Sequence, residues 1–214
     1  KISCKMNSNF NPLSPEELVS RINKIPRIRL AQLPTALEYA PNISKELNIN
    51  LYIKRDDCTA LAFGGNKTRH LEFIMAKTLS EEYDCILTGA ASQSNFCRQA
   101  VAAANKLNLD SYLVLMHGVK GKLMQGNFLL YNILGANVDV VDGENLENIP
   151  KHLDKKYDEL IKEGRKPLLI YGGFGEEDTT LAGISYANTM VEIDKQMKNQ
   201  NFIADHMFVT AANM

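Results

Sequence analysis

From about residue 67 onward, the hydrophobic positions of the chain follow two alternating spacings. Short apolar runs predict buried strands, and apolar residues that recur every three or four positions predict helices. Leu71, Ile74, Met75 and Leu79 form one such helical stripe, which predicts an amphipathic helix after Lys67. In the same way we predict strands at 85–88, 111–116, 137–141, 167–171 and 207–211, and helices at 95–107, 126–134, 153–164 and 183–197.

The segment before residue 67 contains fewer signals. Residues 1–13 are polar and rich in asparagine, so we predict a loose segment there. Ser14-Pro15-Glu16-Glu17 combines a capping serine, a proline at the first helical position and a glutamate three residues after the cap. This combination predicts a helix start. Residues 51–54 predict a strand.

Repeated strand–helix units with short joints predict an α/β fold, in which helices cover both faces of a parallel sheet. Ligands of such sheets bind beyond the carboxyl ends of the strands, on loops that lead into helices. A polar cluster at 89–99 occupies such a place, directly after the strand predicted to end at Thr88. We therefore expect this cluster to contribute to a binding site.

Composition and charge narrow the possible partners. The 214 residues are 45% hydrophobic and carry a net charge of −1, so we expect neither nucleic acid nor a membrane surface as a partner. No apolar run approaches the roughly 20 residues of a membrane helix. Cysteines and histidines are scattered without metal-ligand spacing, so we expect no metal site. Reduced thiols and the lack of a visible secretory signal favour a cytoplasmic location.

The strongest candidate for chemistry is Lys67 in Gly64-Gly65-Asn66-Lys67. Glycines let the backbone approach a ligand closely. A partly desolvated lysine has a lowered pKa and can act as an amine nucleophile, as a Schiff-base lysine does. The alternative is an exposed lysine in the first turn of a helix. A phosphate loop would need glycine directly before the lysine, and no dinucleotide-binding glycine motif follows any predicted strand, so NAD is not expected.

Gln93, Ser94 and Asn95 form a second candidate group at a loop-to-helix junction. Backbone N–H groups and short polar side chains at such a junction can bind an anion. The alternative is that Ser94 or Asn95 only caps the helix.

Arg69 and Arg98 could bind a substrate carboxylate, although ion pairs with acids such as Glu72, Asp56 or Asp57 are the favoured interpretation. Residues 54–57, Lys-Arg-Asp-Asp, also predict an ion-pair network beside the site.

The stretches around Lys67 and Asn95, together with 27–35, 54–57 and 126–136, resemble the pyridoxal-phosphate enzymes related to D-cysteine desulfhydrase and 1-aminocyclopropane-1-carboxylate deaminase. The resemblance runs from about Ile25 to the last residue. It implies a fold type II, tryptophan synthase β-like enzyme that binds pyridoxal 5'-phosphate and forms a homodimer. It also implies a small α/β domain at 68–175 between two segments of a larger domain, 1–67 and 176–214, whose C-terminal part is expected to be missing from this chain.

The resemblance also implies roles for individual residues. Lys67 would form the Schiff base and move a proton, and Asn95 would bind the phenolic oxygen of the cofactor. Ser94 would meet the substrate carboxylate, with Asn95 and Phe96 beside it. His70 stands where relatives often carry a second lysine that neutralises the cofactor phosphate; we expect it to be partly charged near neutral pH and to bind phosphate more weakly. Phe96 replaces a His or Gln that helps to hold substrate, which leaves three alternatives: a different substrate, a carboxylate held by backbone N–H groups, or a damaged substrate site.

The implied activity is that of a lyase or deaminase of small amino acids. D-cysteine desulfhydrase activity, which yields pyruvate, hydrogen sulfide and ammonia, is weakly favoured, and D-serine is a further possible substrate. 1-Aminocyclopropane-1-carboxylate deaminase activity, which yields 2-oxobutanoate and ammonia, is one alternative, and a degenerate, non-catalytic binding protein is another.

A third alternative is a fragment that exposes its core. In the family, a phosphate-binding loop follows the strand that corresponds to 208–211, so we expect the 214-residue chain to be inactive by itself. Residues 172–175 resemble the family's Gly-Gly-Ser-Asn turn, and 176–180 predict a small insertion before the helix at Gly183.

Overall fold

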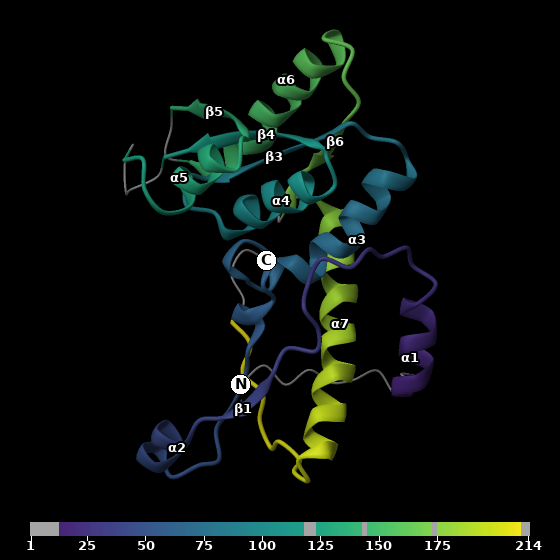
Figure 1. The fold of residues 1–214 in the computed structure, drawn as a ribbon, viewed down its shortest axis with the longest axis vertical. Helices are drawn as coiled ribbons and strands as arrows, with labels where there is room; N and C mark the ends of the chain where they lie inside the picture. The colour runs from purple at the N-terminus through teal and green to yellow at the C-terminus, as the bar shows by residue number, and fades with distance from the viewer. Residues whose placement is uncertain (1–12, 118–122, 143–144, 173–174, 211–214) are drawn as a thin grey trace.

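The computed structural model describes residues 13–117, 123–142, 145–172 and 175–210, which form two parts linked by two helices (Figure 1). The helices are α1 (Pro15–Ile22), α2 (Pro41–Leu47), α3 (Lys67–Ser80), α4 (Asn95–Lys106), α5 (Gly126–Ile133), α6 (Ile149–Lys162) and α7 (Glu176–Asn199). Short 3-10 helices are η1 (Asp56–Cys58), η2 (Leu61–Phe63) and η3 (Leu146–Asn148). The strands are β1 (Leu37–Tyr39), β2 (Tyr52–Lys54), β3 (Cys85–Ala91), β4 (Asp110–Met116), β5 (Asn137–Val141) and β6 (Pro167–Ile170).

The upper part in Figure 1 is built on a four-stranded sheet in the order β5-β4-β3-β6. All of its neighbouring strands are parallel. Successive side chains of a strand point to opposite faces, and both faces of this sheet are buried. Leu87 packs with α6, whereas its neighbour Ile86 packs with α3 and α4. The predicted α/β fold, with helices on both faces of a parallel sheet, is confirmed.

The lower part contains a second, antiparallel pair of strands, β1 and β2, which the sequence patterns predicted only in part. Tyr39 and Tyr52 face each other across this pair, with ring centroids 5.3 Å apart. Phe202 follows α7 and stacks on Tyr52, with ring centroids 4.0 Å apart. A three-residue strand such as β1 is too short to show a sequence period, so its pairing depends on these long-range contacts.

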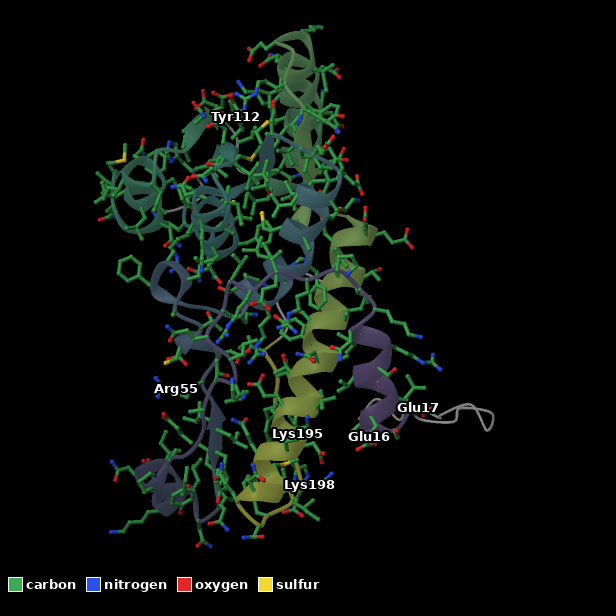
Figure 2. All side chains as sticks on the ribbon, turned by 45° about the vertical axis from the view of Figure 1, so that its right-hand side comes forward. Glu16, Glu17, Arg55, Tyr112, Lys195 and Lys198 are labelled. Carbon is green, nitrogen blue, oxygen red and sulfur yellow. The ribbon has the colours of Figure 1, made fainter. Side chains whose placement is uncertain are left out.

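Helix α7 is longer than predicted and joins the two parts. The helix start predicted at Gly183 is wrong, because α7 already begins at Glu176 and includes residues 176–180; that these residues are an insertion relative to the family stays a prediction. Three acidic residues in its first turn favour a helix start through their interaction with the helix dipole. In Figure 2, turned by 45° from Figure 1, Lys195 and Lys198 mark the lower end of α7, and Glu16 and Glu17 mark the start of α1 beside it.

The strand predicted at 207–211 is not formed by residues 207–210, which pair with no strand among the described residues. The side chain of Phe208 is 91% exposed. An apolar run becomes a strand only when a neighbouring strand accepts its hydrogen bonds, and none does so here. The loose segment predicted at 1–13 lies outside the described residues except for its last position, as do Gly173 and Phe174 of the predicted glycine turn.

Candidate active site around Lys67

Lys67 is the first residue of α3 and is half-buried. Burial lowers the pKa of its amine below the ordinary lysine value, because the charged form loses hydration in the protein. This agrees with the interpretation of Lys67 as a desolvated lysine and not with that of an exposed one. The geometry is suitable for an amine nucleophile, and the covalent role of Lys67 stays a prediction.

The turn that precedes Lys67 has a backbone in the positive-φ region. Three non-glycine residues within 60–63 adopt φ of +75°, +45° and +67°, and Gly64 and Gly65 follow at +74° and +129°. Such conformations cost non-glycine residues of order 1–3 kcal/mol each and persist only when surrounding contacts hold them. The turn must therefore be held from outside, and two side chains of α4 make the contacts.

The first of these side chains is Arg98, which connects the turn to the N-terminal end of α4. Its guanidinium donates to the carbonyl of Ala62, to that of Gly64 at 3.3 Å and to Oδ1 of Asn95 at 3.2 Å. Within the described ranges, no carboxylate lies within ion-pair distance of Arg98, so the expected acidic partner is wrong for this residue. Burial lowers its pKa, and backbone carbonyls take the place of a carboxylate.

The second is Gln99, which binds both segments. Its Oε1 accepts from the backbone N–H and the hydroxyl of Thr68, each at 2.8 Å, and its Nε2 donates to the carbonyl of Asn95 at 3.1 Å. The polar cluster and the lysine turn, separated by about a helix and a strand in the sequence, are thus hydrogen-bonded neighbours.

Ser94 and Asn95 begin α4 after the carboxyl end of β3. Ser94 is the N-cap, and its Oγ accepts from the backbone N–H of Cys97 at 3.2 Å, so the capping interpretation is confirmed for it. Asn95 is exposed, and its Oδ1 accepts from Arg98 and from Nδ2 of Asn127 at 3.0 Å. Because the oxygen is engaged by two donors, the Asn95 amide can offer a ligand only N–H donors.

His70 lies one turn after Lys67 and is buried against Phe96, with ring centroids 5.9 Å apart. Burial, and to a smaller extent the charge of Lys67, lower the pKa of His70 to about 4. His70 is therefore neutral at pH 7, so the expectation of a partly charged histidine is wrong. Its Nε2 is buried and has no hydrogen-bond partner among the described residues. Phe96 packs on the core formed by α3, α4 and the sheet.

Asp178, in the first turn of α7, is a further perturbed group close to His70. Its Oδ2 accepts from the backbone N–H of Gly172 at 2.9 Å. Burial raises the pKa of Asp178 to about 6. A hydrogen bond to the backbone of Asp178 partly opposes the lowering of the His70 pKa, which places the two residues in contact.

The predicted ion-pair network is confirmed, and it extends to α7. Arg69 is 1% exposed and binds both Asp56 and Glu192. Lys54 binds Glu192 as well. Glu72, which was also expected to pair, binds Arg27. Helix α3 is thus attached through charged side chains to the N-terminal part of the chain and to α7.

The residues present fit pyridoxal phosphate on two observations. The half-buried amine of Lys67 has a lowered pKa, as attack on an aldehyde requires. The buried Nε2 of His70 lacks a partner, and such a group is expected to find one in a bound ligand or water. Among the described residues, no group of three or more His, Cys, Asp or Glu is arranged to hold a metal ion.

Sequence reasoning missed the site roles of Gln99, Asn127 and Tyr186. Gln99 follows Asn95 at the i, i+4 spacing of one helix face, which is a usable signal. Asn127 lies in a stretch that carries the family resemblance. Tyr186, on α7, accepts a hydrogen bond from the side chain of Asn66, and nothing in the local sequence indicates this contact across 120 residues.

Residues 28–213 match the family of pyridoxal-phosphate dependent enzymes, and the chain belongs to this family. It is 38% identical over 181 residues to a protein of Pyrococcus horikoshii named "Putative 1-aminocyclopropane-1-carboxylate deaminase", covering 84% of this chain and 54% of the relative. It is 36% identical over 183 residues to D-cysteine desulfhydrase of Klebsiella pneumoniae, covering 83% and 54%. The chain spans about half the length of the curated relatives it matches.

Solved structures support the fold. A crystal structure of an ACC deaminase homologue superimposes with a TM-score of 0.76 at 35% identity, covering 87% of this chain and 55% of that one. Diaminopropionate ammonia lyase from Escherichia coli superimposes with a TM-score of 0.62 at 16% identity, covering 92% and 52%, and supports the fold alone. The expected fold type II architecture is confirmed. No helix in the described ranges is both long and apolar enough to cross a membrane.

Proposed function

We propose that the protein carrying this chain is a pyridoxal-phosphate-dependent lyase or deaminase of small amino acids, with D-cysteine as the favoured substrate. The observation that carries this proposal is the half-buried Lys67, whose pKa is lowered by burial and whose turn is hydrogen-bonded through Arg98 to Asn95. The nucleophile and the polar group that would bind a ligand thereby belong to one site.

Each residue of this site has a distinct proposed task. The Lys67 amine holds the cofactor aldehyde and, once released, accepts or returns a proton at the substrate. The N–H donors of Asn95 bind the phenolic oxygen of the cofactor, and the start of α4 at Ser94 binds the substrate carboxylate. The neutral His70 ring already donates to the backbone of Asp178, so its Nε2 would lie beside the cofactor phosphate as an acceptor, able to bind a protonated phosphate oxygen. The bound cofactor supplies an electron sink for the substrate carbon.

Deamination of 1-aminocyclopropane-1-carboxylate is the second candidate, because relatives of both names match the chain at similar identity. Phe96 affects how the carboxylate of either substrate would be bound. Its apolar ring occupies the position next to Asn95 and cannot hydrogen-bond a substrate, so a carboxylate there would be held by the backbone N–H groups at the start of α4.

We also propose three properties that extend beyond the site. The chain divides into a small domain at 68–175 and two segments of a larger one, 1–67 and 176–214. The division is supported by Lys67 and Glu176 being the first residues of α3 and α7. The protein is a homodimer, and it works in the cytoplasm, as its scattered thiols suggest.

The first experiment is a visible-absorbance titration of the purified protein with pyridoxal phosphate, followed by borohydride reduction and peptide mapping. We expect a new absorbance band and a label on Lys67. Lys67→Ala should abolish the band and the label. Lys77 lies on the same helix but forms an ion pair with Glu177, so Lys77→Ala should retain the band and the label. A label spread over surface lysines in wild-type protein contradicts the proposal.

The substrate is tested next with D-cysteine, D-serine and 1-aminocyclopropane-1-carboxylate. Release of hydrogen sulfide and pyruvate from D-cysteine supports the favoured activity, and release of 2-oxobutanoate supports the alternative. Binding of pyridoxal phosphate at Lys67 without turnover of any of the three, measured on the protein that carries this chain, supports the non-catalytic alternative.

A further inference from the structure

The Gln99 side chain is fully buried beneath the turn that carries Lys67. Its amide makes three hydrogen bonds: two accepted by Oε1 from Thr68 and one donated by Nε2 to the carbonyl of Asn95. Thr68 is also fully buried, so water is not available to replace these bonds. Loss of a partner would leave buried polar groups unsatisfied.

Gly65 rests directly on this amide. A Cβ built on Gly65 would lie 2.5 Å from Nε2 of Gln99, which is closer than real side chains approach. The carbonyl of Gly65 accepts a hydrogen bond of 2.8 Å from the hydroxyl of Thr59, another fully buried residue. Besides Arg98, the turn before Lys67 is therefore held by the Gln99 amide beneath it and the Thr59 hydroxyl beside it, with no room for displacement toward α4.

We propose that Gln99 is a positioning residue for Lys67, which fixes the first turn of α3 against the first turn of α4 so that the lysine amine stays beside the Asn95 end of the site. This inference rests on the proposed function for its catalytic meaning. Gln99 acts through Thr68, Gly65 and Asn95 and contacts neither cofactor nor substrate.

The chemistry of the residue explains why an amide is suited to this place. The N–H at the first turn of α3 needs an acceptor, because helix starts leave such donors without a partner in the helix. The carbonyl of Asn95 needs a donor. A neutral amide supplies an acceptor and a donor at once, whereas an ionised carboxylate supplies only acceptors and a thioether supplies no donor and only a weak acceptor.

The test measures the Lys67 amine itself in cofactor-free protein. Competitive acetylation across pH with peptide mass spectrometry yields the inflection of the Lys67 profile, with the exposed Lys155 as internal reference. Because Gln99 holds Lys67 in its half-buried place, Gln99→Met should move the inflection toward that of a free lysine, near 10.4. We expect this inflection to rise, which reduces the unprotonated fraction of Lys67 at neutral pH.

A matched pair of substitutions separates positioning from stability. Thr68→Val and Thr78→Val each remove one fully buried hydroxyl from α3, but Thr78 donates to Ile74, away from the site. We expect Thr68→Val to shift the Lys67 inflection in the same direction as Gln99→Met, while Thr78→Val lowers the melting temperature without shifting it. Thr68→Ser, which keeps the hydroxyl, should restore the wild-type profile.

Folded Gln99→Met and Thr68→Val proteins whose Lys67 inflection equals that of Thr78→Val would overturn the proposal. If Gln99→Met does not fold, Thr68→Val decides by the same comparison. The titration with pyridoxal phosphate tests the proposed function separately from the positioning role of Gln99. Wild-type protein that fails to bind the cofactor at Lys67 refutes the proposed function, whereas the acetylation profile still decides the role of Gln99.

Discussion

Replacing Arg69 by methionine tests the buried ion-pair network that attaches α3 to the rest of the protein. The guanidinium binds both oxygens of Asp56 at 2.8 and 2.9 Å and both oxygens of Glu192 at 3.0 Å each. It also binds the hydroxyl of Thr35 at 3.1 Å. Methionine keeps much of the apolar stem and removes all five hydrogen bonds, so the packing changes less than the charge does.

The loss of stability in Arg69→Met depends on which partners Asp56 and Glu192 keep. Removing one partner of a buried pair costs about 3–5 kcal/mol, because a charge is left uncompensated. Glu192 keeps Lys54 and the backbone N–H of Thr35, and the Asp56 side chain is 18% exposed to water. We therefore expect the lower end, a loss of about 3 kcal/mol, which is a large share of the roughly 5–15 kcal/mol that typical domains possess.

The assay is urea unfolding at pH 7, with Arg165→Met as control. Arg165 also binds two carboxylates, those of Asp84 and Asp110, but with partly exposed partners. Exposed pairs contribute about 0–1 kcal/mol. A loss below about 1 kcal/mol for Arg69→Met, equal to that of the control, would refute the view that this network holds α3 in place.

The same variant makes a pH prediction with a definite sign. Although burial by itself would raise it, the pKa of Glu192 is lowered in the folded state by its bonds to Arg69 and Lys54. A carboxylate with a depressed folded pKa stabilises the fold above its unfolded value, near 4.3, and loses this contribution as the pH falls through the folded value. The difference between wild type and Arg69→Met should therefore be largest at neutral pH and should shrink below about pH 4.

Three further substitutions test other parts of the site. Gly65→Ala should destabilise the chain by at least about 2 kcal/mol in urea unfolding, because φ is +129° and the new Cβ would meet Gln99; a smaller loss would show that the turn relaxes. The raised pKa of Asp178, about 6, means that its contribution to stability is full below about 3.8 and is lost as the pH rises through 6. Asp178→Asn should therefore stabilise the protein at pH 8 by up to about 3 kcal/mol and leave it unchanged at pH 3.5; equal stabilities at pH 8 would contradict the raised pKa. His70→Leu removes a buried nitrogen without a partner but also the ring's hydrogen bond to the backbone of Asp178, so thermal stability without cofactor should change little, whereas pyridoxal phosphate should bind more weakly in an absorbance titration; unchanged affinity would exclude His70 from the cofactor site.

Local patterns sufficed for the sheet and its helices. Strand β5 was predicted with its exact bounds, and β4 and α4 were predicted to within one residue, because each coincides with a short apolar run or with a helical spacing of apolar positions. The helix start at Ser14 was equally readable, since its capping box involves residues three positions apart. The two errors at the C-terminal side, the start of α7 and the strand at 207–211, concern segments whose structure depends on distant partners.

Some features of the candidate site could likewise be predicted from local sequence, and others depended on distant contacts. Lys67, Ser94 and Asn95 could be found from the sequence, because a glycine pair before a lysine and a polar group at a helix start are short motifs with their own chemistry. The neutral state of His70 could not, since it follows from burial against Phe96. The backbone partners of Arg98 could not be predicted either, because every residue has a backbone carbonyl and no sequence pattern distinguishes those of Ala62 and Gly64.

The sequence by itself therefore determined the class of fold, the family and the candidate Schiff-base lysine, because these depend on periodicity and on contiguous motifs. Only the tertiary structure decided how that lysine is held. Gln99 meets Thr68 across 31 positions and Arg69 meets Glu192 across 123. Such contacts form where the packing of α3, α4 and α7 brings distant polar groups out of water together, and burial then makes each of them find a partner.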